Sequence, residues 1–385
     1  MSGSRILTSH AGSLPRPAPL VDLYARRARG EEIDEAELAN SAEAATHWVV
    51  EQQRQSGIDI PSDGEQVREA FFLYVQRRMK GFGGSWARPG GSELKNYPEF
   101  AEARRRSMAV STAVSNFAPP MATGPIEYAD QTANAEELRI FKDALSRHEG
   151  AFADAFMTAP SPGIVAMAMK NQYYDTFEEY LTAVTDALSI EYRAAIDAGF
   201  ILQIDAPDLA LERHISYSDQ PVQEFVTFVR AVVGQINRAL EGLPRDRVRL
   251  HVCWGNYESP HDQDVPLRDI VEAIKEANVG GFMLPFANPR HQHEINVFRD
   301  YPLGKDQKLL VGVIDTTTNF VEHPEVVAER LERAAGVVGD PSRILAGTDC
   351  GFDTSAGMGR VTSDVVWAKL RAMREGADLA ASRLF

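Results

Sequence analysis

The chain has 385 residues, of which 44% are hydrophobic and 25% charged, and its formal net charge is −15. These values are typical of a globular protein with room for one α/β barrel, and no apolar run approaches the roughly 20 residues that a membrane-spanning helix needs. The acidity argues against nucleic acid as a partner, because phosphate binding depends on clusters of Lys and Arg, and the short Arg104–Arg106 run is interpreted as a solvated helix face.

Short apolar, β-branched segments alternate along the chain with longer amphipathic ones. Strands are expected at Arg5–His10, Ile58–Ser62, Pro120–Ile126, Ala155–Pro160, Phe200–Asp205, Arg247–Trp254, Gly281–Phe286, Leu309–Asp315 and Arg343–Cys350. Apolar spacing of three and four residues indicates helices at Ala36–Gln55, Phe177–Ala198, Pro221–Leu240, Pro266–Ala277, Pro324–Val338 and Ser363–Ala380. This order predicts a parallel sheet closed into a (β/α)8 TIM barrel. Nine strand candidates exceed eight, so one is either an extra hairpin strand or not a strand.

No linker-like stretch divides the chain, so we expect a single catalytic barrel over residues 1–385. The Gly-rich segment 81–97 is expected to be a loop excursion from that barrel. The N-terminal sequence lacks the basic and apolar regions of a secretory signal, which predicts a cytoplasmic protein. In that reducing compartment a disulfide between Cys253 and Cys350 is not expected.

Polar side chains gather at the predicted carboxyl ends of the strands, where (β/α)8 enzymes build their active sites. They are Asp63–Glu65, Gln203–Asp205, His251–Cys253, Asp315 and Asp349–Cys350. Residues i and i+2 of a strand share a face, so His251 and Cys253 point the same way and Val252 points at the helices. Together with Cys350 they form a donor set typical of zinc with a position open for substrate. The alternative is that both cysteines are buried core residues.

Seven motifs carry a family resemblance. They are S-H-A-G-S-L-P-R-P at Ser9–Pro17, S-D-G-E at Ser62–Glu65, L-Q-I-D-A-P at Leu202–Pro207, H-V-C-W-G-N at His251–Asn256, F-A-N-P-R-H at Phe286–His291, N-F-V-E-H-P at Asn319–Pro324 and G-T-D-C-G-F at Gly347–Phe352. With them the chain resembles the C-terminal catalytic barrel of the cobalamin-independent methionine synthases over nearly its whole length. It is most similar to the short single-barrel relatives, which include the epoxyalkane:coenzyme M transferases. The resemblance implies a methionine synthase/uroporphyrinogen decarboxylase-like barrel.

The same resemblance implies a zinc-dependent, cobalamin-independent methyltransferase of methionine biosynthesis. Zinc would activate a small, homocysteine-like thiol, and a methyltetrahydrofolate-type donor would supply the methyl group. Three residues match family zinc ligands: His251, Cys253 and Cys350. Four match residues that hold the ammonium and carboxylate groups of the thiol substrate: Gly12, Ser13, Glu65 and Asp205.

Two positions depart from the family pattern. Pro285 stands where the family has a glutamate ligand, so zinc would keep three protein ligands or recruit another residue. Nearby candidates for that role are Glu258, His291, His293 and Glu294. Thr317 replaces a histidine thought to help protonate the departing folate, and threonine cannot act as that kind of general acid. Thr317 is nevertheless placed with Glu65 and Asp205 in the predicted catalytic set.

Several alternatives remain open at this point. The departures at Pro285 and Thr317 favour another electrophile, such as an epoxide opened by a thiolate, and a coenzyme M sulfonate would call for Arg or Lys in its site. A non-catalytic barrel that binds a thiol or a metal is a further alternative. Glu65 and Asp205 could instead cap helices, and Asp349 is expected to anchor a loop or orient His251. A homo-oligomer is compatible with the sequence.

Overall fold

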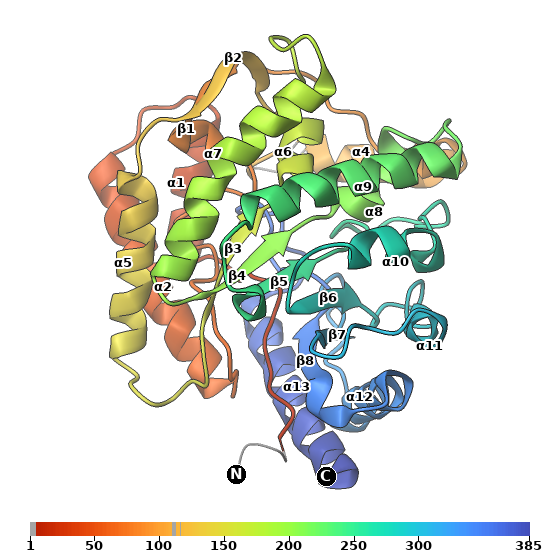
Figure 1. Ribbon diagram of the computed structural model, residues 1–385. Helices are drawn as coiled ribbons and strands as arrows, with labels where there is room; N and C mark the ends of the chain where they lie inside the picture. Colours follow the sequence, from red (N-terminus) through yellow and green to blue (C-terminus); the bar gives the residue numbers. More distant parts are fainter. Residues whose placement is uncertain (1–4, 110–112, 116) are drawn as a thin grey trace.

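Six parallel strands in sequential order form the centre of the protein (Figure 1). The computed structural model describes residues 5–109, 113–115 and 117–385. The strands are β3 (Phe156–Pro160), β4 (Ile201–Asp205), β5 (Val248–His251), β6 (Gly281–Pro285), β7 (Lys308–Ile314) and β8 (Ile344–Thr348). Each pairs in parallel with the next, as expected for strands joined by helical crossovers.

Two extended segments near the N-terminus close this sheet into a ring. Thr8 forms a parallel bridge with Ala346 of β8, and the Ile60 amide donates to the Thr8 carbonyl at 3.0 Å. On the other side, the Phe156 amide of β3 donates to the Pro61 carbonyl at 2.9 Å. The two segments therefore take the first two positions of an eight-membered barrel, which confirms the predicted fold class.

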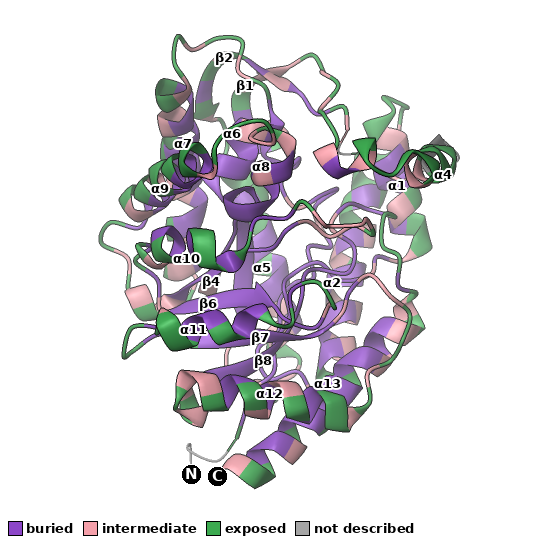
Figure 2. Ribbon diagram, turned by 90° about the vertical axis from the view of Figure 1, so that its right-hand side faces the viewer, coloured by how far each residue is buried: buried purple, intermediate pink, exposed green. Residues whose placement is uncertain are grey.

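Helices surround the barrel and turn their buried faces toward it (Figure 2). The longer ones are α1 (Ala18–Ala28), α2 (Glu35–Gln55), α4 (Pro98–Ala109), α5 (Thr132–Ser146), α7 (Phe177–Asp197), α9 (Val222–Ala239), α10 (Leu267–Lys275), α12 (Pro324–Val338) and α13 (Ser363–Leu384). The shorter ones are α3 (Val75–Arg78), α6 (Pro162–Ala168), α8 (Asp208–Ile215) and α11 (Val297–Asp300). Thr176 and Glu179 form a capping box that starts α7, and Gly339 ends α12 in the left-handed conformation, φ 80°.

One of the nine predicted strands, Pro120–Ile126, lies outside the barrel. It is β2 (Met121–Tyr128), which pairs antiparallel with β1 (Met79–Gly83), so the extra-hairpin alternative is the right one. Part of the expected loop 81–97 is therefore regular, since it begins inside β1 and contains a 3-10 turn at Ser92–Lys95. β1 is mostly half-buried, and its Met-Lys-Gly-Phe-Gly sequence lacks the alternation that marks a strand.

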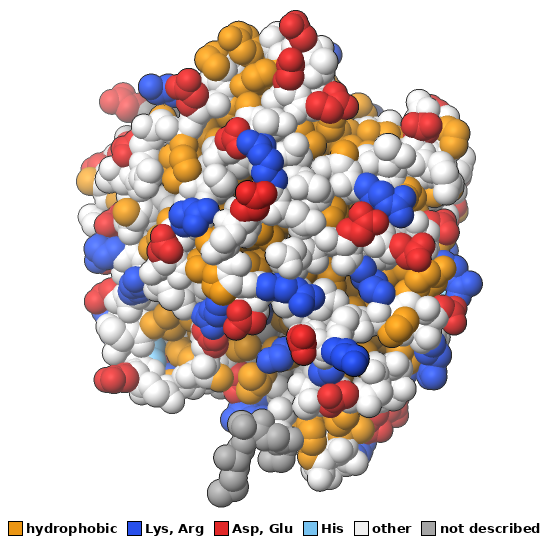
Figure 3. Space-filling model, viewed as in Figure 1, with side chains coloured by type: hydrophobic (Ala, Val, Ile, Leu, Met, Phe, Trp, Pro, Cys, Tyr) orange, Lys and Arg blue, Asp and Glu red, His pale blue; other side chains and the backbone are white. Residues whose placement is uncertain are grey.

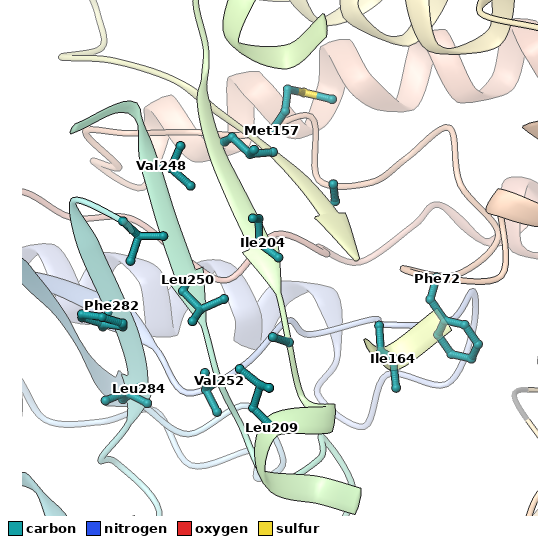
Figure 4. Close-up of a cluster of buried hydrophobic side chains, with 14 of the residues drawn as sticks. Phe72, Met157, Ile164, Ile204, Leu209, Val248, Leu250, Val252, Phe282 and Leu284 are labelled. Atoms are coloured by element: carbon teal, nitrogen blue, oxygen red, sulfur yellow. The ribbon is translucent and has the colours of Figure 1, made fainter. Parts of the chain in front are cut away.

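Two apolar clusters hold the barrel together. The larger lies between the strands and the helices, where Ile204, Leu250 and Val252 pack together (Figure 4). Val252 thus points away from the barrel interior, as predicted. The smaller cluster fills the interior: Ala11, Ile60, Phe156, Met283, Leu310 and Leu345.

Charges of both signs are dispersed over the face of the molecule shown in Figure 3, and acidic and basic side chains alternate across it. Across residues 5–109, 113–115 and 117–385, no helix combines the length and apolar character needed to cross a membrane. Most surface arginines sit beside a carboxylate, as Arg139 does with Glu136 and Arg383 does with Glu325.

Candidate functional site

One cavity of about 210 Å³ lies at the carboxyl ends of the strands. Its wall includes Glu65, Asp205, His251, Cys253 and Cys350. These residues come from four barrel positions that are far apart in the sequence. The parallel strands bring them together at the end of the barrel where this fold places catalytic residues.

Three ligand-type side chains converge in that cavity. The ligand atoms of His251, Cys253 and Cys350 all lie within 4.8 Å of one another, and the two sulfur atoms are 3.8 Å apart. All three side chains are buried. His251 ends β5, Cys253 follows two residues later, and Cys350 lies just beyond β8. The predicted donor set is therefore assembled, with one imidazole and two thiols.

A chain of hydrogen bonds supports His251 from inside the barrel. Its Nδ1 lies 3.0 Å from Asp205 Oδ1, which also accepts from Gln203 Nε2 at 2.7 Å. Gln203 Oε1 in turn accepts from Arg249 Nε at 2.8 Å. The register of β4 and β5 explains this, because Asp205 is opposite His251 and Gln203 is opposite Arg249. Gln203 was predicted among the strand-end polar residues without a role, and Arg249 was missed, although both lie two residues before a predicted site residue and so on its face.

Hydrogen bonds and charges among His251, Cys253 and Cys350 shift the pKa values of all three side chains. Burial disfavours the imidazolium, but hydrogen bonds with Asp205 and Cys253 raise the pKa of His251 to about 10. The hydrogen bond with Cys350 lowers the pKa of Cys253 against the effect of burial, and His251 lowers it further. The same contact raises the pKa of Cys350. The group carries one thiolate readily and a second only when another positive charge compensates.

Glu65 lies in the cavity wall with one carboxylate oxygen unsatisfied. Its Oε1 accepts from Thr158 Oγ1 at 3.1 Å, whereas Oε2 is buried without a hydrogen-bond partner in the described part of the chain. Burial, and then the negative charge of Asp205, raises the pKa of Glu65 to about 8. A positively charged group in the cavity would satisfy this oxygen and offset the repulsion between the two carboxylates.

The N-terminal loop comes close to Glu65 at Gly12. The residue has φ +120°, and a Cβ there would lie 2.5 Å from Thr158 Cγ2 and 2.8 Å from Glu65 Oε1. Only glycine fits this approach. Ser13 lines the cavity, and its carbonyl accepts from the Phe352 amide at 2.8 Å, which fixes the loop beside Cys350.

Pro285 stands where the sequence resemblance leads us to expect a glutamate ligand, and its side chain cannot coordinate a metal. Pro285 is buried at the end of β6, and the loop after it is fastened by Asp349. The Asp349 carboxylate accepts from the amides of Phe286, Ala287 and Asn288 at 2.9–3.0 Å, which confirms its predicted role as a loop anchor. Over residues 5–109, 113–115 and 117–385, no fourth ligand atom joins the His–Cys–Cys group within the 4.8 Å that its members share.

The two candidate histidines for a fourth ligand are placed elsewhere. His291 bonds Asp264 at 2.9 Å and Glu294 at 2.8 Å in a separate buried cluster. Neither His293 nor Glu258 contributes to the cavity wall. The three-ligand alternative is thus the one that the geometry favours.

Thr317 is bonded away from this group. Its amide and hydroxyl both donate to Asp315 Oδ1, at 2.6 and 2.8 Å, and it is absent from the cavity wall. The neighbouring Thr316 is also absent from the wall, but its hydroxyl donates at 2.9 Å to Oδ1 of Asn256, which lines the cavity.

A second group of three ligand-type residues lies at the surface between α2 and α5. Its members are Glu43, His47 and Asp143, none of them fully buried. Both carboxylates already pair with arginines, Glu43 with Arg139 and Asp143 with Arg147. These arginines neutralise the charge that would attract a metal ion, so this group is a poor candidate.

Segments outside the barrel strands complete the cavity wall and bring arginines to it. Arg88, Arg104 and Arg360 contribute, together with Tyr257. The run at 104–106 was predicted to be a solvated helix face, and this is confirmed for Arg105, whose side chain is 73% exposed, and for Arg106. The prediction is wrong for Arg104, which is half-buried and lines the cavity.

The chain is similar in sequence and in structure to several known proteins. No family model matches it. A methionine synthase from Sulfolobus acidocaldarius is 23% identical over 349 residues, 90% of this chain and 85% of that protein. Another from Thermococcus kodakarensis is 27% identical over 351 residues, 90% and 86%.

Two solved structures share the barrel. A B12-independent methionine synthase from a Shewanella species, in complex with selenomethionine, has a TM-score of 0.74 at 20% identity and matches over 99% of both chains. A putative vitamin-B12-independent methionine synthase from Listeria monocytogenes has a TM-score of 0.66 at 22% identity, over 98% of this chain and 99% of that one. These likenesses show that the fold is shared.

Proposed function

Because the chain belongs to the cobalamin-independent methionine synthase family, we propose that it is a zinc-dependent methyltransferase acting on a small, homocysteine-like thiol. The methyl donor would be of the methyltetrahydrofolate type. The observation that carries the proposal is the buried His251–Cys253–Cys350 group, which shares one cavity with the carboxylates of Glu65 and Asp205.

The three ligand-type residues suit zinc in their chemistry. One imidazole and two thiolates are soft and borderline donors that zinc prefers, and three protein ligands are typical of a catalytic site. Zinc bound there would supply a positive charge that deprotonates a coordinated substrate thiol near neutral pH. Asp205 would hold the His251 ring in place through Nδ1, which leaves the other ring nitrogen free of carboxylates.

The rest of the cavity suits an amino-acid thiol. The unsatisfied Glu65 oxygen and the adjacent Asp205 would receive an ammonium group. Ser13, with the preceding Gly12, would meet the carboxylate through the N-terminal loop. Held through both groups on its α-carbon, the substrate would present its sulfur to the electrophile in one orientation, which converts binding free energy into rate.

A second candidate function keeps the thiol chemistry and changes the electrophile. Pro285 and Thr317 replace two family residues, and Thr317 bonds to Asp315 rather than facing the cavity. A zinc-dependent alkyltransferase acting on another donor, such as an epoxide, is consistent with these departures. Asn256 lies in the cavity wall and its Oδ1 accepts from the Thr316 hydroxyl, so its side-chain NH2 would then be the group available to a developing alkoxide.

The proposal is tested by metal content and product formation in cysteine variants. Cys253→Ser and Cys350→Ser should each lose bound zinc and lower methionine formation from homocysteine and 5-methyltetrahydrofolate by roughly a hundred-fold or more. His47→Gln, which removes a ligand-type residue from the surface group, is the matched control and should change neither. Unchanged zinc content in both cysteine variants would refute the site. Zinc loss without any methionine formed by the wild type would favour the second candidate.

A further inference from the structure

The cavity carries charges of opposite sign on two parts of its wall. The barrel strands and the loops after them contribute the carboxylates of Glu65 and Asp205, close to the His–Cys–Cys group. The outlying segments contribute the guanidinium groups of Arg88, Arg104 and Arg360. In a chain with a net charge of −15, three arginines on one cavity wall stand out against the general surface charge. Such a wall would attract an anion that the rest of the molecule repels.

Two of these arginines already have carboxylate partners, and the third has none. Arg88 is paired with the buried Glu212, and Arg360 Nη1 lies 2.7 Å from the exposed Glu258. Arg104 forms no hydrogen bond or ion pair with any residue of the described ranges 5–109, 113–115 and 117–385. Its guanidinium carbon lies over the ring of Tyr257, 5.0 Å from the centroid.

This environment leaves the Arg104 charge incompletely compensated. Burial lowers the pKa of Arg104, and the nearby Arg360 acts in the same direction, against the opposing effects of Tyr257 and Glu93. Arginine nevertheless stays protonated at neutral pH. A partly buried cation without a hydrogen-bonded anion is unfavourable, and an anionic ligand would relieve that penalty.

We propose that Arg104, flanked by Arg360 and supported by the Tyr257 ring, binds an anionic group of a substrate that fills this cavity. A carboxylate, sulfonate or phosphate would suit the planar guanidinium. The proposal rests on the thiol-transfer function proposed above. Because Glu65 and Asp205 provide for a cation at the strand ends, the anion would belong to the part of the substrate that extends away from them. It is carried either by the alkyl donor or by the distal end of the thiol.

Matched pairs of probes test the proposal on the zinc-loaded protein by titration calorimetry. The thiol pair is 2-mercaptoethanesulfonate and 2-mercaptoethanol, and the donor pair is 5-methyltetrahydrofolate and the methylated tetrahydropterin that lacks its glutamate tail. Arg104→Gln should weaken the anionic member of at least one pair about ten-fold or more and leave its uncharged partner within about two-fold. Arg105→Gln, one residue away on the solvated face of α4, is the control and should change neither.

The outcome also locates the anion. A loss confined to the sulfonate places it on the thiol, and a loss confined to the folate places it on the donor. Equal losses for charged and uncharged members of both pairs, or no loss in either, would overturn the proposal. Failure of the proposed function would give a different result. Zinc in the wild type would gain no sulfur ligand from any thiol, whether or not Arg104→Gln weakens the charged probes more than the uncharged ones.

Discussion

Replacing Gln203 by methionine tests how the barrel interior supports the metal site. Gln203 is fully buried, donates to the Ala11 carbonyl at 2.8 Å and to Asp205 at 2.7 Å, and accepts from Arg249 at 2.8 Å. Methionine has similar size and makes none of these bonds. Each partner left without its bond costs about 1–3 kcal/mol, and both Asp205 and Arg249 keep other partners. We therefore expect Gln203→Met to lower the free energy of unfolding by roughly 3–5 kcal/mol.

The same change should weaken zinc binding, because Asp205 would no longer be fixed against His251. Loss of such a supporting contact lowers metal affinity by roughly 10–100-fold. Urea unfolding gives the first quantity, and competition with a chromophoric chelator gives the second. Gln307→Met is the matched control: this buried glutamine accepts from the Gly304 amide at 2.9 Å and lies just before the start of β7. It should lose stability and keep zinc affinity. Unchanged zinc affinity in Gln203→Met would refute the reasoning.

Three further predictions concern the cavity and one neighbouring cluster. Gly12→Ala should destabilise the protein by roughly 2–5 kcal/mol, since it adds a clash with Glu65 to an unfavourable φ, whereas Gly150→Ala, with φ +76° and open space, should show the φ effect alone in thermal unfolding. Glu65→Gln should weaken homocysteine binding about ten-fold or more in calorimetry and leave 2-mercaptoethanol unaffected; equal effects on both would indicate a structural role. Although burial opposes it, hydrogen bonds to Asp264 and to a second carboxylate raise the pKa of His291 to about 9. This folded-state pKa lies above the unfolded value of about 6.5, so the stabilisation from protonated His291 is complete below pH 6.5 and is lost as the pH rises through 9. The free energy of unfolding should therefore fall between about pH 6.5 and 9 in the wild type, and fall less in His291→Gln.

The fold was largely predictable because strand order and helix periodicity are local signals. The prediction was weakest where neighbouring chain segments decide the structure. β1 carries too little apolar alternation to be recognised and exists because β2 pairs with it. The segments around Thr8 and Ile60 were expected as strands, and they close the barrel through only a few hydrogen bonds each.

The three ligand-type residues of the candidate site were predictable from the sequence, whereas the roles of the residues that support them were not. His251, Cys253 and Cys350 lie at strand ends, so alternation alone predicts that they converge. The roles of Gln203 and Arg249 depend on the register between β4 and β5, which the sequence does not specify. Whether an arginine of a basic run faces solvent or a cavity depends on how α4 packs, and this separates Arg104 from the two arginines after it.

Zinc-edge X-ray absorption of the purified protein, with and without homocysteine, tests thiol activation most directly. Without thiol, about one zinc per chain should show one nitrogen and two sulfur ligands, from His251, Cys253 and Cys350. Addition of homocysteine should raise the number of sulfur ligands to three. No zinc in the protein, or zinc whose sulfur count does not change with any thiol, would contradict the account.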